Sequence, residues 1–153
     1  MSDSPRLAIA GNQSTTIDLA QSLIDEGYNL GLIINCGPEK AHMISGYMDL
    51  ASFAEEHEIP LYRPHRYTLK SKRDREALLA YTMDAVVLNG WQRLLPEWFL
   101  ESLRFGAYGM HGSSEPLPKG RGRSPLNWSL IEGRDRFISH LLKLDIGVDS
   151  GKI

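Results

Sequence analysis

The sequence predicts an α/β protein in which helices cover both faces of a mostly parallel β-sheet, a three-layer α/β/α sandwich. Short apolar runs alternate with helical patterns along the whole chain. Residues 84–90 (DAVVLNG) form a continuous apolar run, which is typical of a parallel strand covered on both faces. Alternation at this pitch favours parallel strands joined by right-handed crossovers. The 153 residues fit one domain, residues 1–153, without repeats, linkers or low-complexity segments.

The first half of the chain contains two strand–helix units and a brief third strand. Residues 6–10 (RLAIA) are a short apolar run ended by Gly11 and Asn12, which predicts a strand. Residues 14–27 begin with Ser and Thr residues that can cap a helix, carry apolar residues at helical spacing and end at Gly27. The next expected elements are a strand at 28–36, a helix at 46–59 before Pro60, and a brief strand at 61–64.

The second half alternates in the same way. Residues 70–83 are first charged and then apolar, which predicts a helix, and the apolar strand at 84–90 follows. The remaining expected elements are helices at 95–103 and 124–133 and strands at 105–111 and 136–146. Pro96 stands in the first turn of its helix, where a missing N–H is tolerated. The chain stops at residues 149–153 (DSGKI) without a closing helix, so we expect the domain to be incomplete and the natural protein to be longer.

The composition is that of an ordinary globular protein, with 42% hydrophobic and 24% charged residues. A net charge of -2 gives no general attraction to nucleic acid or to anionic membranes, so any anion site must be local. Cys36 is the only cysteine, which excludes an internal disulfide, and we expect it to be a small buried residue. No apolar stretch reaches the roughly 18 residues of a membrane span, and the N-terminus lacks a secretion signal. The sequence therefore predicts a cytoplasmic protein.

Ligands of open parallel sheets bind outside the carboxyl ends of the strands, and three segments of this chain fall there. Residues 11–16 (GNQSTT) form a strand-to-helix turn whose N–H groups could hold an anion. The turn lacks the complete G-x-G-x-x-G of dinucleotide sites, and a simple capped turn is the alternative. Residues 89–96 (NGWQRLLP) place Trp91 beside polar neighbours, which could form a slot for a flat heterocycle. Ordinary surface packing at the start of a helix is the alternative there.

The third segment, residues 108–128, combines His111 at a strand end with a loop dense in Gly and Pro. A lone histidine is more often structural, but the loop composition favours a shaped functional loop. Lys119, Arg121 and Arg123 alternate with glycines, so they form either a solvated basic loop or a hold on phosphate or carboxylate. Downstream, Asp149 could pair with His111 and accept a proton. Asp145 lies in the same downstream loop.

Taken in order, these segments resemble the folate-dependent formyltransferase family, which includes glycinamide ribonucleotide, methionyl-tRNA and sugar N-formyltransferases. The family signature is Asn-x-His-Pro-Ser-Leu-Leu-Pro, a basic residue and Arg-Gly, a helix, and then Asp-x-Gly before a strand. Residues 109–133 (GMHGSSEPLPKGRGRSPLNWSLIEG) and 145–153 (DIGVDSGKI) are similar to it, with His111 as the histidine and Asp149 as the aspartate. The loop from His111 to Pro118 is two residues longer than usual. Residues 89–100 (NGWQRLLPEWFL) resemble the Gly-x-x-Arg-Ile/Leu-Leu segment of the family's pterin slot.

The resemblance covers essentially the whole chain and implies a Rossmann-like fold and formyl transfer from N10-formyltetrahydrofolate to an amine. The amine would attack the formyl carbon, His111 would stabilise the resulting oxyanion, and Asp149 would orient the imidazole and relay the amine's proton. An oxyanion donor of this kind contributes about 3 kcal/mol to the barrier. No metal is implied. The implied folate-binding residues are Gly90, Trp91, Arg93, Leu94, Leu95 and Asp145, and the implied acceptor-binding residues are Gly11, Asn12, Gln13, Ser113, Lys119 and Arg121.

One departure from the family concerns the first catalytic position, where Gly109 replaces the family's asparagine two residues before His111. Because residues 84–90 should pair beside residues 105–111, we expect the Asn89 carboxamide to reach the space above Gly109 and act as the catalytic donor, with Gln92 in reserve. The alternative is that Asn89 caps its own loop.

The acceptor is less clear than the donor. A transfer RNA would favour a basic surface and a further domain, and the sequence shows neither, so an amino sugar on a nucleotide or another small amine is the expected acceptor. A non-catalytic folate- or nucleotide-binding member of the family, broken at Gly109, is the second hypothesis. A Rossmann-like NAD(P) enzyme fits the strand pattern but not the incomplete glycine motif. A homodimer is compatible with the sequence.

Overall fold

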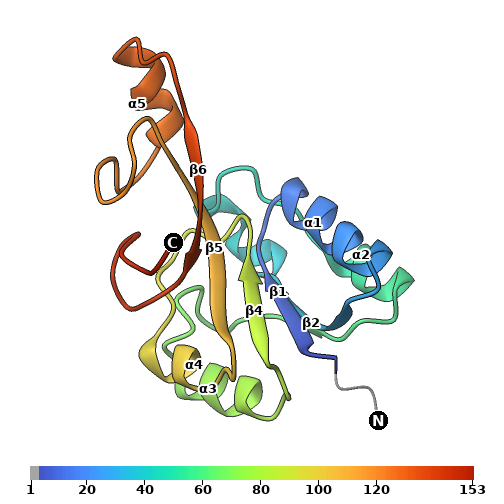
Figure 1. The fold of residues 1–153 in the computed structure, drawn as a ribbon. Coiled ribbons are helices and arrows are strands. Elements are labelled where there is room, and N and C mark those ends of the chain that lie inside the picture. The colour runs from blue at the N-terminus through green and yellow to red at the C-terminus, as the bar shows by residue number, and fades with distance from the viewer. Residues whose placement is uncertain (1–3) are drawn as a thin grey trace.

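A six-stranded sheet with helices on both faces organises residues 4–153, the part of the chain that the computed structural model describes (Figure 1). The strands lie in the order β3-β2-β1-β4-β5-β6. Their bounds are β1 Arg6–Ala10, β2 Asn29–Ile34, β3 Leu61–Tyr62, β4 Ala85–Leu88, β5 Gly106–Ser113 and β6 Ile138–Lys143. The helices are α1 Ser14–Asp25, α2 Ala51–Glu56, α3 Lys72–Leu79, α4 Glu97–Glu101 and α5 Pro125–Ile131, with a 3₁₀ helix η1 at Pro38–Met43. The predicted α/β class and mostly parallel sheet are confirmed.

The order of the strands reverses its direction between β1 and β4. The chain builds β1, β2 and β3 outward on one side, and α3 then returns it to β4 on the other side of β1. Strands β1 to β5 pair in parallel, so their carboxyl ends share one edge of the sheet. The switch in order opens a crevice at that edge, which is where a ligand site is expected.

Strand β6 departs from the parallel pattern that the alternation predicted, because it pairs antiparallel with β5. The segment between them, which carries α5, does not cross back over the sheet. It stands away from the body at the far end of the β5–β6 arm, and the chain re-enters the sheet where β5 ended (Figure 1). Although α5 lies between β5 and β6, this connection is not a crossover between parallel strands.

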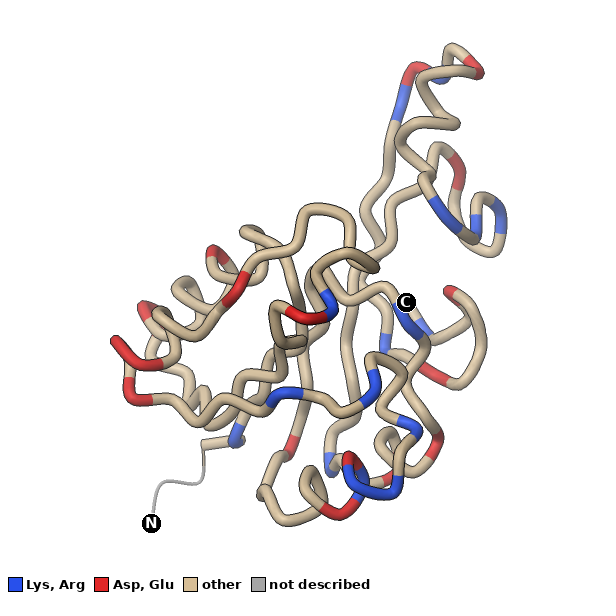
Figure 2. Tube along the Cα trace, turned by 180° about the vertical axis from the view of Figure 1, so that it is seen from behind, with Lys and Arg blue, Asp and Glu red and all other residues tan. Residues whose placement is uncertain are grey.

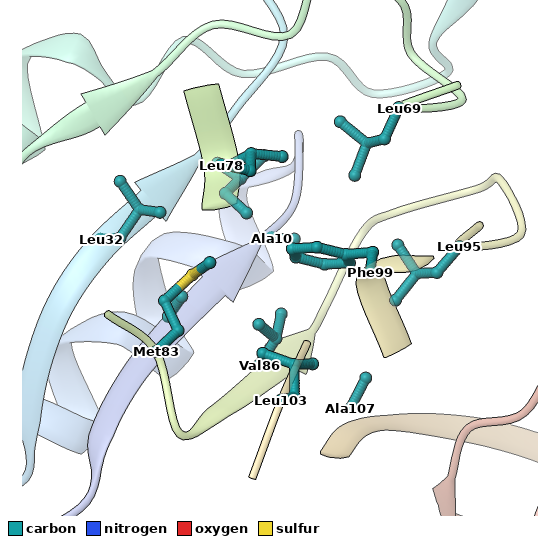
Figure 3. Packing of buried hydrophobic residues seen from close by; sticks show 12 residues of the cluster. Ala10, Leu32, Leu69, Leu78, Met83, Val86, Leu95, Phe99, Leu103 and Ala107 are labelled. Carbon is teal, nitrogen blue, oxygen red and sulfur yellow. The ribbon is translucent and has the colours of Figure 1, made fainter. Parts of the chain in front are cut away.

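Apolar side chains fill both faces of the sheet, as a sandwich requires. On one face, residues from β1, β2, β4 and β5 pack against α3 and α4, with the Phe99 ring fully buried among them (Figure 3). On the other face, Ile9 and Ile33 pack against Ala20 of α1 and Phe53 of α2. Consecutive residues of β1 alternate between these two clusters, as strand geometry demands.

Within residues 4–153, all five α-helices are shorter than the ranges expected from the sequence, and α2 is shortened most. The helix expected at 46–59 occupies only Ala51–Glu56, because residues 46–50 are held in other contacts. Gly46 adopts a left-handed φ of 69°, the Met48 N–H donates to the Asn12 carbonyl, and the Leu50 N–H donates to the Asn35 side chain. The helix expected at 95–103 covers Glu97–Glu101. Within residues 4–153, no helix combines the length and apolar character needed to cross a bilayer.

Candidate functional site

A cleft of about 780 Å³ opens at the carboxyl ends of β4 and β5 and is closed on its other sides by the loops that follow β4, β5 and β6. Its volume lies within the usual range for small-molecule sites, about 300–1,000 Å³. Among the residues predicted from the sequence, the cleft is lined by Asn89, Gly90, Trp91, Arg93, Leu94, Leu95, His111, Asp145 and Asp149. The predicted acceptor-binding residues do not line it.

The pairing of β5 with β6 brings His111 and Asp149 together. Nδ1 of His111 lies 3.4 Å from Oδ1 of Asp149, and their side chains are 10% and 22% exposed. Asp149 holds a left-handed φ of 48°, and its Oδ2 accepts a hydrogen bond of 2.9 Å from the Gly122 N–H. Nε2 of His111 lies 2.8 Å from the Gly120 carbonyl oxygen. A carboxylate that orients an imidazole inside a cleft is an arrangement suited to hydrogen-bond donation and proton relay.

Asn89 does not lie where we expected it. Its side-chain oxygen accepts a hydrogen bond of 2.7 Å from the Thr15 hydroxyl of α1. In the β4–β5 register Leu88 is opposite Gly109, so these two residues share one face of the sheet and Asn89 points to the other. A Cβ added to Gly109 would instead meet the two methyl carbons of Leu144, at 3.4 and 3.5 Å. The expectation that the Asn89 carboxamide fills the space above Gly109 is therefore wrong.

The loop that follows β4 is shaped by Tyr67, which the sequence gave no reason to single out. Its ring packs edge-on against Trp91 at 4.8 Å between centroids, and the Arg93 guanidinium lies 4.8 Å from the same ring. Its hydroxyl accepts a hydrogen bond of 2.9 Å from the Gln92 N–H. Burial raises the pKa of Tyr67. Trp91 Nε1 is buried and has no hydrogen-bond partner within residues 4–153, while 49% of Leu94 is exposed.

The side chains of the predicted turn at residues 11–16 mostly contact neighbouring loops of the protein. Asn12 is fully buried, and its side-chain oxygen accepts hydrogen bonds from the Cys36 N–H and the Asn35 side chain. Gly11 has no room for a side chain, because an added Cβ would lie 1.8 Å from the Asn89 carbonyl oxygen. Neither residue lies where an acceptor can touch it. Gln13 is partly exposed and donates to the Ser45 carbonyl.

The loop between β5 and α5 carries the cations expected from the sequence (Figure 2). Lys119 is paired with Glu115 at 3.1 Å, and the buried Ser113 hydroxyl donates to the Lys119 carbonyl. Arg121 and Arg123 are exposed, and Arg123, not Arg121, lines the cleft. Within residues 4–153, no three His, Cys, Asp or Glu side chains are placed to hold a metal ion.

Asp145 is exposed and folds back on its own loop. Its Oδ1 accepts hydrogen bonds from the Ser150 hydroxyl at 2.5 Å and from the Gly147 N–H at 2.9 Å. These bonds, the Ser150 bond first, and the charge of Arg121 lower the pKa of Asp145. The carboxylate therefore shapes the rim of the cleft.

Comparison with known proteins identifies the class. The family model described as formyl transferase matches residues 11–153, and the chain belongs to that family. The methionyl-tRNA formyltransferase of Bartonella tribocorum is 29% identical over 153 residues, which cover 97% of this chain and 48% of the relative. That of Azobacteroides pseudotrichonymphae is 32% identical, over 97% of this chain and 45% of the relative. The chain thus spans about half the length of these curated relatives.

Solved structures agree with this assignment at the level of the fold. Phosphoribosylglycinamide formyltransferase from Bacillus halodurans aligns with a TM-score of 0.72 and 23% identity, over 95% of this chain and 75% of the other. A formyltetrahydrofolate deformylase from Pseudomonas putida aligns with a TM-score of 0.69 and 17% identity, over 97% of this chain and 51% of the other.

Proposed function

We propose that the protein transfers a formyl group from N10-formyltetrahydrofolate to an amine. The observation that carries this proposal is the His111–Asp149 pair, which lies inside the cleft at the strand ends. Family membership supports the same reaction class. The relatives that match are named for methionyl-tRNA and the structural neighbours for phosphoribosylglycinamide, so the donor is better supported than the acceptor.

The cleft offers suitable groups for a reduced folate. Trp91 lines the cleft, and Leu94 presents an exposed apolar side chain there. The loop of Gly90 to Leu95 adds backbone groups that can meet the polar edge of a pterin. When bound, the folate supplies an activated formyl group.

The chain's own residues then have distinct tasks. The Nε2 side of His111 donates a hydrogen bond to the oxygen on which negative charge develops. Asp149 orients the imidazole through Nδ1, and its carboxylate can receive the amine's proton. Losing one such donor typically costs about 100- to 1,000-fold in turnover.

For the acceptor we propose an amino sugar on a nucleotide, or another small amine that carries an anionic group. The net charge of -2 gives no general attraction for a polyanion such as RNA. Three cations, Lys119, Arg121 and Arg123, instead lie within five residues of one loop. A local cluster of this kind suits a phosphate or carboxylate on a small molecule.

The experiment measures tetrahydrofolate release from 10-formyltetrahydrofolate with a panel of amines: nucleotide-linked amino sugars, glycinamide ribonucleotide and methionyl-tRNA. Wild-type protein should transfer to at least one of them, and His111→Ala should be at least 100-fold slower. Quenching of Trp91 fluorescence by 5-formyltetrahydrofolate reports binding separately. Absence of folate binding at millimolar concentration would remove the folate proposal.

A non-catalytic binding protein is the second candidate, because Gly109 lacks the family's carboxamide and Leu144 lies beside it. Gly109→Asn and Gly109→Ala form a matched pair, since a Cβ at this position meets ordinary contact distances of 3.4 Å or more. Folate binding without transfer in the wild type, together with transfer in Gly109→Asn but not in Gly109→Ala, would establish this second function.

A further inference from the structure

One short segment, residues 120–122, contacts both residues of the proposed catalytic pair. The Gly120 carbonyl oxygen lies 2.8 Å from Nε2 of His111. Two residues later, the Gly122 N–H donates to Oδ2 of Asp149 at 2.9 Å. The backbone of these three residues therefore forms contacts with Nε2 of His111 and Oδ2 of Asp149.

These contacts compete with a substrate. Nδ1 of His111 faces Asp149, so Nε2 is the nitrogen left to meet a reacting oxygen. An imidazole N–H has a single hydrogen to donate, and the Gly120 carbonyl takes it in this conformation. The proposed oxyanion donor becomes available only when residues 120–122 move.

The segment has a fixed base and a free end. At the base, the Ser113 hydroxyl donates to the Lys119 carbonyl at 3.1 Å, and the Leu117 N–H donates to the buried His140 ring at 3.3 Å. Gly120 and Gly122 both adopt left-handed φ angles, 75° and 105°. No atom lies within 4 Å of a Cβ added to Gly122, so this end faces open space. Glycine crosses between backbone regions more easily than any other residue, which suits a hinge.

Two exposed cations lie on the segment or directly after it. Arg121 lies between the glycines and Arg123 follows them at the cleft wall, and both side chains are exposed. Neither forms an ion pair with a carboxylate of residues 4–153 at hydrogen-bonding distance. A phosphate that binds both guanidiniums accepts several charge-assisted hydrogen bonds, the same kind of bond as that from the Gly122 N–H to the Asp149 carboxylate, so an anion can compete with the two backbone contacts.

We propose that residues 120–122 are a latch that caps His111 and Asp149 at rest, and that an anionic group opens it by binding Arg121 and Arg123. The inference deepens the proposed function and rests on it for the identity of the catalytic pair. Formyl transfer then waits for an acceptor that carries phosphate or carboxylate. A bound folate without such an acceptor meets a capped histidine.

Amide hydrogen exchange at residue 122 tests the latch directly. Gly122→Ala forces a β-carbon into a left-handed backbone, which costs about 1–2 kcal/mol and should reduce the protection of this amide roughly 5- to 30-fold. Gly133→Ala is the matched control, because Gly133 also has a positive φ, 62°, and no atom within 4 Å of an added Cβ. The control should leave residue 122 unchanged. An unprotected amide at residue 122 in the wild type, or equal protection in Gly122→Ala, would overturn the latch.

Amide exchange at residue 122 in the presence of pyrophosphate tests whether an anion opens the latch. Pyrophosphate should accelerate exchange at residue 122 severalfold in the wild type and in Lys119→Gln, which removes a cation from the fixed base. The double variant Arg121→Gln/Arg123→Gln should lose the response. If pyrophosphate changes nothing in the wild type, anions do not open the latch. Because these measurements need neither folate nor acceptor, they succeed or fail separately from folate binding to the wild type, which tests the proposed function.

Discussion

The side chain of Asp74 holds the loop that shapes one wall of the cleft, so its replacement should affect both stability and the site. Asp74 is fully buried at the start of α3. One carboxylate oxygen accepts from the Tyr62 hydroxyl and the His65 N–H, both at 2.7 Å. The other accepts from the Arg66 N–H at 3.0 Å and the Ser71 hydroxyl at 2.5 Å. All four donors belong to the segment that carries Tyr67 or flank it.

Asp74→Asn keeps the shape and removes one acceptor. In either orientation of the amide, its NH₂ group faces two donors that had been satisfied by an oxygen. A buried donor without a partner costs about 1–3 kcal/mol, so we expect a loss of roughly 3 kcal/mol in the free energy of unfolding. The Tyr67 loop should loosen as well, which would weaken the hydrogen bond from the Gln92 N–H at the wall of the cleft.

The effect should depend on pH. Burial by itself raises the pKa of Asp74, but the hydrogen bonds from Ser71, Tyr62 and the backbone outweigh it and lower the pKa overall. Because the pKa of Asp74 in the folded protein is lower than its unfolded value of about 3.9, ionised Asp74 stabilises the folded protein at pH values above about 3.9. This contribution disappears as the pH falls through the folded pKa. The stability difference between wild type and Asp74→Asn should therefore narrow in acid.

Urea denaturation at pH 7 and near pH 3, followed by far-ultraviolet circular dichroism, measures both effects. Asp84→Asn provides a control with the same chemical change, because Asp84 is only partly buried and its carboxylate accepts a hydrogen bond of 2.8 Å from the Arg6 N–H. It should cost less than about 1.5 kcal/mol. The reasoning fails if the two variants are equally stable at pH 7, or if the Asp74→Asn deficit is independent of pH.

Three further predictions address the core, the thiol and the cleft. Phe99→Ala empties the centre of the cluster between the sheet and α4 and should cost about 3–5 kcal/mol in urea denaturation. Cys36 is fully buried, and burial raises the pKa of its thiol to about 11, so native protein at pH 8 should react with iodoacetamide only as fast as it unfolds. Tyr67→Phe removes the acceptor for the Gln92 N–H and should weaken 5-formyltetrahydrofolate binding about fivefold, measured by fluorescence, at a cost of about 1 kcal/mol in stability.

The strands could be predicted because each is a short apolar run, a feature of the local sequence. Runs such as Ala85–Leu88 are apolar throughout, and turn residues bound them closely. The direction of β6 was not predictable in this way, since direction depends on the path of the connection. The sequence of the segment with α5 predicted an ordinary crossover helix, yet the segment stands off the sheet and β6 returns antiparallel beside β5.

Some residues of the candidate site could be predicted from sequence motifs, and others are placed only by contacts between distant segments. His111 and Asp149 were found through resemblance to a motif, and β5–β6 pairing provides the physical means of bringing them together across the intervening residues. Tyr67 carries no signal of its own. Its place against Trp91 follows from the anchoring of its loop by Asp74, a contact between residues that no local pattern connects. Asn12 was expected to face a ligand, but it is fully buried and its side-chain oxygen accepts hydrogen bonds from residues 35 and 36.

The position of the Asn89 side chain depends on the register between β4 and β5. The alternation of side chains along β4 is fixed, so one of Leu88 and Asn89 must share a face with Gly109. Which one does depends on how β4 slides against β5, and a shift by a single residue would reverse the answer. The observed register puts Leu88 on the side of His111 and turns Asn89 toward Thr15. A second donor beside His111 must therefore come from the cleft loops or from a side chain restored at residue 109, which is why the Gly109→Asn and Gly109→Ala pair separates a catalyst from a binding protein.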